Sequence, residues 1–187
     1  MKPSVSVIIP SFKRIEQTIK TLRLILESDG VGRIFDMEVI VADCSPDEKL
    51  KKAIHKTFGN TVIYTRPKKP GIATNKNQGA KVAKGEIIVF CDSDIEVEDI
   101  TILNTIQSLE KYPTAAMLGG TVLWRGGQRN GQVDRPEEYD RRLIDEGVIY
   151  IEVLYSRYIA TYKDIFDEVG GYDELVFNMR GEGADIS

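Results

Sequence analysis

A run of five apolar residues, IIVFC at positions 87–91, leads directly into Asp92, Ser93 and Asp94. A continuous apolar run rich in β-branched residues is typical of a strand buried on both faces, as in the middle of a parallel sheet. Such a strand should end at the polar residues, so both aspartates are expected at its carboxyl tip, where open α/β sheets bind ligands. Two carboxylates separated by one residue can bind a hard divalent cation, although the same pattern also occurs in solvated turns.

Strand-like and helix-like segments alternate along the chain before position 125. Apolar runs typical of strands lie at residues 5–10, 37–42, 61–65, 87–91 and 115–124. Apolar residues at helical spacing lie between them, at residues 14–28, 46–58, 72–84 and 100–109. This alternation predicts one α/β domain over residues 1–187, a three-layer α/β/α sandwich with a mainly parallel, mixed central sheet.

The segment after the second expected strand carries a signal for the start of a helix. Ser45 as N-cap, Pro46 at the first helical position and Glu48 three residues after the cap form a capping box. Asp43, just before it, could also cap this helix. We therefore expect the second helix to begin at Pro46.

The last third of the chain has weaker patterns. Residues 125–140 are rich in Gly, Arg, Asn, Gln and acids, and predict a mobile loop. Residues 147–154 alternate weakly and predict a strand, perhaps one that runs against the sheet direction. A further strand is expected at residues 158–162, followed by a short helix at residues 163–169 that Gly170 and Gly171 close.

Composition excludes several classes of function. Acids outnumber bases by 29 to 25, and the net charge of −4 gives no support for nucleic-acid binding. His55 is the single histidine, so histidine-based metal sites and Ser-His triads are hard to build. Cys44 and Cys91 suit reduced thiols in a cytoplasmic protein. No apolar run is long enough to span a bilayer and no signal-peptide pattern is seen, while peripheral membrane contact stays open.

Four stretches occur in an order and spacing that chance rarely produces. They are Pro10-Ser11-Phe12; the strand that ends at Asp43; residues 71–79 (GIATNKNQG) with Gly85-Glu86 and Asp92-Ser93-Asp94; and residues 162–174 with 181–185. Together they span nearly the whole chain and resemble the inverting family 2 glycosyltransferases of the GT-A fold.

The resemblance implies a division of the chain into two halves. Residues 1–94 would bind a nucleotide-diphosphate sugar, and residues 95–187 would form the acceptor side. The acceptor itself, a glycan, protein or lipid, is not specified. Strands two and four would flank strand one, which would place Cys44 and Cys91 about 10 Å apart, too far for a disulfide.

The resemblance also assigns roles to individual residues. Those of the donor site are Pro10, Ser11, Phe12, Asp43, Lys76, Asp92, Ser93 and Asp94. The first three would wall the nucleobase pocket, and Asp43 would accept a hydrogen bond from the base. Lys76 would place positive charge on the diphosphate, unless it faces solvent on its helix. Asp94, with Asp92 beside it or on the ribose, would bind Mn²⁺ or Mg²⁺.

The acid that deprotonates the acceptor has two candidates. Glu182 is preferred and Asp185 is second, because Gly183 stands where many relatives have aspartate. A carboxylate is sufficient as the general base of an inverting displacement. The structural alternative is a pair of solvated acids in a glycine-rich tail.

The resemblance implies a hexosyltransferase, and three other functions are alternatives to it. A sugar-phosphate nucleotidyltransferase would need a glycine-rich loop after the first strand, where this chain has SFKR at residues 11–14. A phosphatase with an Asp-x-Asp nucleophile would need Thr or Val at position 96, which is Glu96. A GT-A domain that binds nucleotide without turnover fits the same motifs and stays open.

Overall fold

The computed structural model describes residues 2–113, 115–120, 144–145, 148–149 and 157–177. Its strands are β1 (Ser4–Ser11), β2 (Asp36–Asp43), β3 (Val62–Thr65), β4 (Ile87–Cys91), β5 (Leu118–Gly119), β6 (Ile144–Asp145), β7 (Val148–Ile149) and β8 (Tyr158–Tyr162). Its helices are α1 (Ile15–Leu26), α2 (Lys49–Phe58), α3 (Ile72–Val82), α4 (Thr101–Lys111), α5 (Lys163–Glu168) and α6 (Glu174–Phe177). Strands and helices alternate from β1 to β5, as the sequence predicts.

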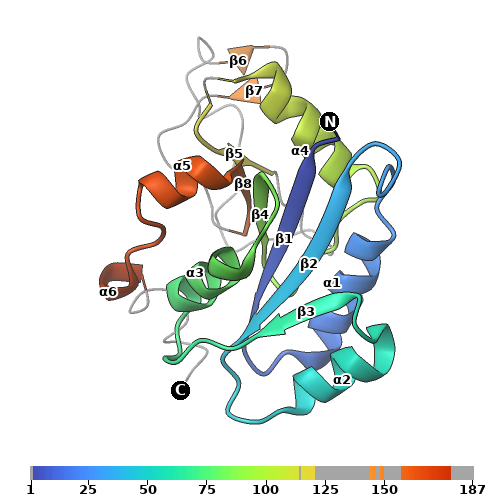
Figure 1. Ribbon diagram of the computed structural model, residues 1–187, viewed down its shortest axis with the longest axis vertical. Coiled ribbons are helices and arrows are strands. Elements are labelled where there is room, and N and C mark those ends of the chain that lie inside the picture. Colours follow the sequence, from blue (N-terminus) through green and yellow to red (C-terminus); the bar gives the residue numbers. More distant parts are fainter. Residues whose placement is uncertain (1, 114, 121–143, 146–147, 150–156, 178–187) are drawn as a thin grey trace, which may run out of the picture.

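The main sheet has six strands in the order β3-β2-β1-β4-β8-β5 (Figure 1). β2 and β4 both pair in parallel with β1, so that Val7 lies opposite Val39 on one side and Val89 on the other. β8 runs antiparallel to β4, and β5 antiparallel to β8. The sheet is therefore mixed and mostly parallel, as expected. Cys44 and Cys91 are free, as this strand order predicts.

The sheet separates two hydrophobic cores, and side chains on opposite faces of β1 contribute to each. Val7 and Ile9 belong to the larger core, which includes residues of α1, α2 and α4. Ile8 belongs to the smaller core, together with Ala80 of α3 and Phe166 of α5. In Figure 1, α3 lies in front of the sheet and α1 behind it. These contacts confirm the predicted three layers, because successive side chains of a strand point to opposite faces.

Two glycines let backbone segments approach closely on the α3 side of the sheet. A β-carbon at Gly79 would lie 2.2 Å from Cγ2 of Ile8, so the helix can rest on β1 only without a side chain there. At Gly85 it would lie 2.6 Å from the backbone nitrogen of Ser6. Gly85 N–H donates a hydrogen bond of 2.8 Å to Ser6 Oγ, which fixes the turn that leads into β4.

We expect Gly85→Ala to lower the free energy of unfolding by about 3 kcal/mol, because backbone atoms cannot move aside as a flexible side chain does. Urea unfolding followed by circular dichroism measures the change. Lys84→Ala, at the neighbouring exposed position, is the matched control and should cost no more than about 0.5 kcal/mol. Equal stability of the two variants would contradict the close approach.

The expected capping box at the start of α2 is wrong. The helix begins at Lys49, its N-cap Glu48 makes no side-chain capping bond, and Oδ1 of Asp47 accepts instead from the N–H of Lys49 at 3.1 Å. The Ser45 hydroxyl donates instead to Oδ1 of Asp43, at 2.6 Å. A buried carboxylate at the end of β2 binds this hydroxyl, so Ser45 belongs to the turn and not to the helix.

Other expectations need smaller corrections. α4 turns Ile102, Ile106 and Leu109 into the core, whereas Ile100, expected on the same face, is 42 % exposed. The strand expected at residues 115–124 is described only as β5. Within the segment expected as a strand at 147–154, β7 pairs with β6 in a separate two-stranded sheet and does not extend the main one. The loop predicted at 125–140 lies outside the described residues.

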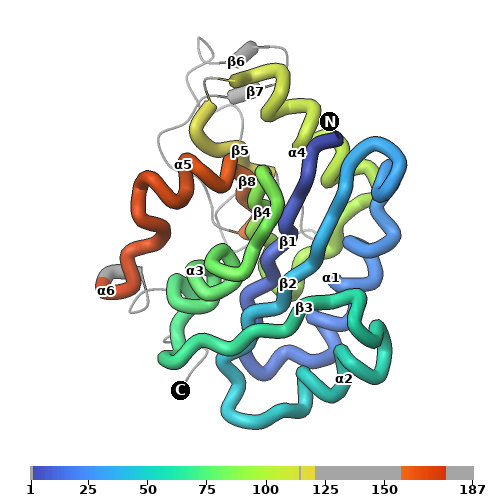
Figure 2. The backbone as a smooth tube through the Cα atoms, viewed as in Figure 1, coloured from blue at the N-terminus to red at the C-terminus, as the bar shows by residue number. Residues whose placement is uncertain are grey.

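After β8 the chain returns past α5 to the side of α3, where α6 lies (Figure 2). Asn77 of α3 fixes this return, because its side chain bonds both backbone groups of Tyr172. It donates to the carbonyl oxygen and accepts from the N–H, each at 2.9 Å.

Of the helices in the described ranges, none has the length and hydrophobicity that a membrane-spanning helix requires.

Candidate active site

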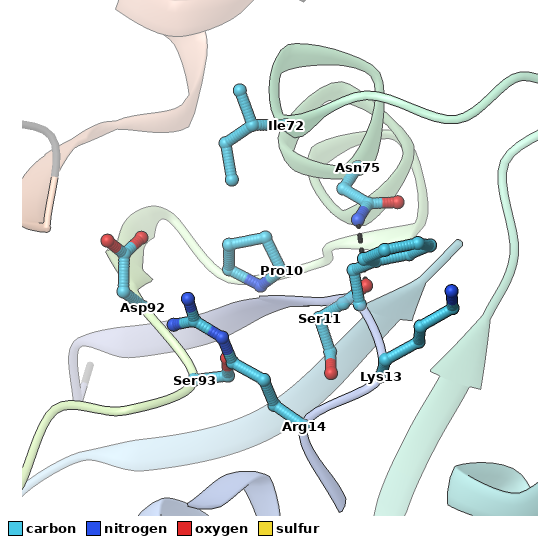
Figure 3. Close-up of a pocket in the computed structure, with 9 residues that line it drawn as sticks. Pro10, Ser11, Lys13, Arg14, Ile72, Asn75, Asp92 and Ser93 are labelled. Carbon is cyan, nitrogen blue, oxygen red and sulfur yellow. Dashed lines mark hydrogen bonds between the residues drawn. The ribbon is translucent and has the colours of Figure 1, made fainter. Parts of the chain in front are cut away.

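A cavity of about 260 Å³ opens at the carboxyl ends of β1 and β4 (Figure 3). Its lining residues are Pro10, Ser11, Phe12, Lys13, Arg14, Ile72, Asn75, Asp92 and Ser93. Five of the predicted donor-site residues therefore line one cavity, although residues 10–12 and residues 92–93 lie 80 or more positions apart in the chain. The fold explains this, since parallel neighbouring strands end at the same edge of the sheet.

Each of the two aspartates after β4 faces a cation from a different element. Oδ2 of Asp94 lies 2.6 Å from Nη1 of Arg14, which precedes α1. Oδ1 of Asp92 lies 3.8 Å from Nζ of Lys76, on α3. Each predicted acid is thus matched by one cation, so an anionic ligand could bind these cations when a divalent cation binds the carboxylates.

Lys76 does not face solvent. Its side chain is 2 % exposed, and its ammonium lies 5.4 Å from the ring centre of Tyr172 and 6.0 Å from that of Phe90. Aromatic faces and a carboxylate partly replace the water that a buried ammonium loses. The solvent-exposed alternative for Lys76 is therefore wrong, and its charge is held at one place beside Asp92.

The aromatic residues around Lys76 form one cluster. The rings of Phe90, Phe166 and Tyr172 lie with centroids 5.2 to 5.7 Å apart. Burial, and secondly the negative charge of Asp92, raise the pKa of Tyr172 to about 12. Tyr172 therefore stays a neutral phenol at physiological pH and does not compete with Asp92 for the charge of Lys76.

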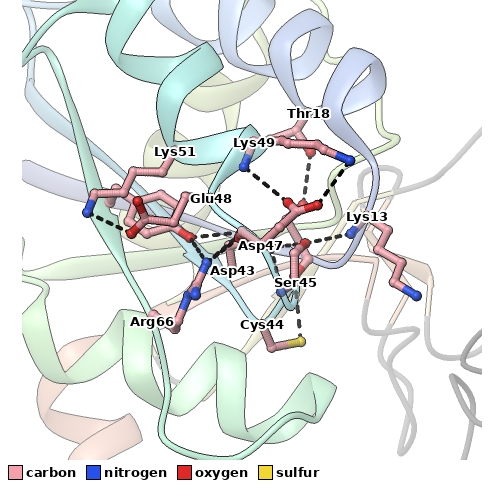
Figure 4. A network of polar contacts seen from close by, with 12 residues as sticks. Lys13, Thr18, Asp43, Cys44, Ser45, Asp47, Glu48, Lys49, Lys51 and Arg66 are labelled. Atoms are coloured by element: carbon pink, nitrogen blue, oxygen red, sulfur yellow. Dashed lines mark hydrogen bonds and ion pairs between the residues drawn. The ribbon is translucent and has the colours of Figure 1, made fainter.

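Asp43 lies at the end of β2, fully buried and outside the cavity lining (Figure 4). Its Oδ1 accepts from the backbone N–H and the hydroxyl of Ser45, and its Oδ2 accepts from the Tyr64 hydroxyl at 2.9 Å. Ser45 Oγ in turn accepts from the backbone N–H of Lys13 at 2.8 Å. Asp43 is thus connected to the cavity through Ser45. Its direct contact with a nucleobase stays a prediction.

The backbone of Lys13 shows why this connection matters. Lys13 is the single non-glycine residue with positive φ in the described part of the chain, at 56°. A left-handed conformation is unfavourable for lysine and needs support from its surroundings. The hydrogen bond that the Lys13 N–H donates to Ser45 Oγ supports it, and so fixes how Phe12 and Arg14 on either side enter the cavity.

Tyr64 gives this network a pH dependence. Its pKa is raised to about 12 from 10.0, first by burial and also by its bond to Asp43. The folded protein holds the phenolic proton more tightly than the unfolded chain, so this stabilisation is complete below about pH 10 and is lost as the pH rises towards 12. We expect the urea midpoint to fall between pH 9 and pH 11, and to fall less in Tyr64→Phe. Tyr172 contributes in both proteins, so a residual slope should remain, whereas equal slopes would contradict the assignment.

Four residues of the lining were not predicted: Lys13, Arg14, Ile72 and Asn75. Asn75 follows Ile72 by three positions, so both lie on the same face of the first turn of α3. Its amide donates to the Ser11 carbonyl at 3.1 Å. Both could have been predicted as lining residues from this helical spacing, because Asn75 directly precedes Lys76, a predicted donor-site residue. The predicted acids Glu182 and Asp185 lie outside the described residues.

Asp92 and Asp94 could supply two of the ligands of one divalent cation, and the remaining ligands must come from elsewhere. In the part of the chain that the structure describes, no group of three His, Cys, Asp or Glu residues could hold a metal ion alone. Asp92 and Asp94 offer hard carboxylate oxygens, the ligand type that Mg²⁺ and Mn²⁺ prefer. Mg²⁺ sites often take one or two carboxylates and fill the remaining positions with phosphate oxygens and water. The chain therefore fits a cation that binds together with a diphosphate.

Fold and site define a GT-A-like α/β domain with an acidic strand tip beside a cavity at the carboxyl edge of its sheet. The family model described as Glycosyl transferase family 2 matches residues 6–170, and the chain belongs to this family. Membership confirms the resemblance seen in the motifs and gives no support to the nucleotidyltransferase or phosphatase alternatives.

Two curated relatives are similar to this chain. Glucosyl-dolichyl phosphate glucuronosyltransferase of Haloferax volcanii is 26 % identical over 92 % of this chain and 56 % of its own length. Dolichol-phosphate mannosyltransferase of Pyrococcus furiosus is 27 % identical over 91 % of this chain and 46 % of its own. The chain thus spans about half the length of these relatives.

Two solved structures share the fold. The mannosyltransferase PcManGT from Pyrobaculum calidifontis, in complex with GDP-Man and Mn²⁺, has a TM-score of 0.66, 19 % identity and coverage of 92 % of this chain and 48 % of its own. TarS of S. aureus in complex with UDP has a TM-score of 0.69, 19 % identity and coverage of 95 % and 52 %. At this identity the likeness shows the fold alone.

Proposed function

We propose that the chain binds a nucleotide-diphosphate sugar in the cavity at the carboxyl edge and transfers its hexosyl group to an acceptor hydroxyl. The observation that carries the proposal is the pair of ion pairs at the end of β4. Asp92 and Arg14 line the cavity, and they pair with Lys76 and Asp94 respectively. Family membership supplies the reaction class, and the charges match a diphosphate with a divalent cation.

The donor would lie across the ends of β1 and β4. Pro10, Ser11 and Phe12 would contact the nucleobase and ribose, with Asp43 fixing their backbone through Ser45. The diphosphate would lie towards Lys76, whose buried ammonium is in place before the ligand arrives. Preorganised charge of this kind is worth more in a partly dry site than in water, because it needs no rearrangement during the reaction.

Departure of the nucleoside diphosphate leaves negative charge on its terminal phosphate. Lys76 would stabilise that charge, while Asp92 and Asp94 would hold Mn²⁺ or Mg²⁺. When bound, such a cation neutralises the diphosphate oxygens as the glycosidic bond breaks. The acceptor hydroxyl would be deprotonated by Glu182, or by Asp185, on the face of the sugar opposite the leaving group, which inverts the anomeric centre.

The donor and acceptor can be narrowed by experiment. The two curated relatives are named for glucuronosyl and mannosyl transfer, and the similar solved structures hold GDP-Man, UDP or UDP-GlcNAc. GDP-mannose, UDP-glucuronic acid and UDP-GlcNAc therefore form the first set of donors to test. The acceptor side, residues 95–187, would select among glycan, protein and lipid hydroxyls. The cytoplasmic location expected from the two cysteines stays a prediction.

Calorimetric titration of UDP and GDP, with and without Mn²⁺, tests the proposal. We expect one nucleoside diphosphate to bind at least about tenfold more tightly with Mn²⁺, and the matching donor to be hydrolysed or its sugar transferred. No binding of either nucleotide in the presence of Mn²⁺ would overturn the proposal. Binding without hydrolysis or transfer of any donor would identify a non-catalytic nucleotide-binding domain instead.

A further inference from the structure

The two cations beside the acidic pair differ in how freely they can move. Lys76 is 2 % exposed and enclosed by aromatic rings, whereas the Arg14 side chain is 36 % exposed and lines the cavity. Asp94, its partner, is 43 % exposed. An exposed ion pair contributes little to stability, so this one can be exchanged at little cost. Separating Lys76 from its surroundings would leave a buried charge unpaired, which is far less favourable.

The Arg14 backbone is fixed even though its side chain is accessible. Its carbonyl accepts hydrogen bonds from the N–H and the hydroxyl of Thr18 in the first turn of α1. Lys13, just before it, is held by Ser45. The guanidinium can therefore change partners by side-chain rotation alone, within reach of both Asp94 and the cavity.

Arg14 and a divalent cation compete for the same carboxylate. Arg14 Nη1 lies 2.6 Å from Asp94 Oδ2, so the guanidinium occupies this oxygen and its charge opposes a metal ion at either oxygen of Asp94. If the cation arrives alone, that ion pair is lost without compensation. If it arrives with a diphosphate, the released guanidinium gains phosphate oxygens, which it can bind through two parallel N–H groups.

We propose that Arg14 couples the binding of the cation to that of the donor. It holds Asp94 while the cavity lacks a diphosphate, and moves to the diphosphate when Asp94 binds the cation. This inference rests on the proposed function. Arg14 is thereby a donor-binding residue and also a competitor of the cation, so cation and nucleotide favour one another's binding more strongly than direct contact between them would produce.

A second ion pair offers a matched control. Lys20 of α1 bonds Glu96 at 2.6 Å and so joins the same helix to the same segment after β4. Neither residue lines the cavity. Lys20→Met therefore removes an equivalent ion pair without touching the cation or the donor.

The test measures Mn²⁺ binding by electron paramagnetic resonance, which counts free Mn²⁺, at increasing UDP or GDP. In Arg14→Met we expect Mn²⁺ alone to bind up to roughly fivefold more tightly. The nucleotide with Mn²⁺ should bind at least about tenfold more weakly, because charge-assisted hydrogen bonds are lost. The coupling factor, which is the nucleotide affinity with Mn²⁺ divided by the affinity without it, should fall at least about tenfold, because the nucleotide alone leaves Arg14 on Asp94. Arg14→Lys should recover part of it, and Lys20→Met should match the wild-type protein.

Three outcomes would count against the inference. An unchanged coupling factor in Arg14→Met would overturn it while leaving the proposed function intact. Weaker binding of Mn²⁺ alone in that variant would show that Arg14 supports the cation site and does not compete for it. If the wild-type protein binds neither nucleotide with Mn²⁺, the proposed function fails and the inference with it.

Discussion

Asp94→Asn is expected to abolish the gain in nucleotide affinity that Mn²⁺ provides, and to lower sugar transfer by roughly 10²- to 10³-fold. The substitution keeps the shape of the side chain and an oxygen that can accept from Arg14, but it removes the negative charge that a divalent cation requires. Asp94 is 43 % exposed and its ion pair is at the surface, so the unfolding free energy should change by about 0.5 kcal/mol or less. Calorimetry with and without Mn²⁺, together with urea unfolding, separates the two effects.

Glu96→Gln is the control for this experiment. Glu96 lies two residues further along the same segment and pairs with Lys20 at the same distance of 2.6 Å, away from the cavity. The variant should bind nucleotide and Mn²⁺ as the wild-type protein does. Retained metal dependence in Asp94→Asn would show that the cation is held by Asp92 or by residues elsewhere, and would remove Asp94 from the donor site.

The sheet could be predicted from the sequence because its strands are specified locally. β4 is buried at every position, and the pattern that marks it, five apolar residues closed by Asp92, needs no partner to be recognised. The bounds of β8 also coincide with the expected ones, and four of its five residues are buried. With two central strands placed and helices between the others, the rules for α/β connections leave few topologies.

The predicted capping box at Ser45 was wrong because tertiary contacts, and not the helix signal in the local sequence, decide where the serine hydroxyl bonds. Ser45 is a good N-cap by itself, but Asp43, two residues earlier, is buried and binds the serine hydroxyl more favourably than a helix end does. The other oxygen of Asp43 accepts from the hydroxyl of Tyr64, 21 residues later, so no local window contains all the contacts of this buried carboxylate. A tertiary contact overrode a local preference.

Arg14 was missed because its role depends on a residue 80 positions away. In the sequence it is one basic residue beside another, ahead of an amphipathic helix. The GT-A order of strands alone brings the end of β1 next to the end of β4. Lys76 could be found because it lies within residues 71–79, a stretch that resembles a family motif, yet its burial by Tyr172 could not, since that contact spans 96 positions.

Lys76→Met should have the second large effect, on donor binding and transfer together. Nucleoside diphosphate affinity is expected to fall at least about tenfold, and transfer by roughly 10²- to 10³-fold, because a preorganised charge at the leaving group is lost. A fully buried ion pair that loses one partner costs about 3–5 kcal/mol of stability. Asp92 keeps 27 % exposure and can be solvated, so we expect a smaller loss, about 1–2 kcal/mol.

Lys81→Met, on the exposed side of the same helix, is the control and should leave affinity, transfer and stability unchanged. Lys76→Arg tests charge against shape. It should restore affinity, because a guanidinium can bind the diphosphate with two N–H groups, while it lowers stability by about 1–3 kcal/mol through overpacking against Phe90 and Tyr172. If Lys76→Met binds and transfers as well as Lys81→Met, the buried ammonium serves the packing of the aromatic cluster and not the donor.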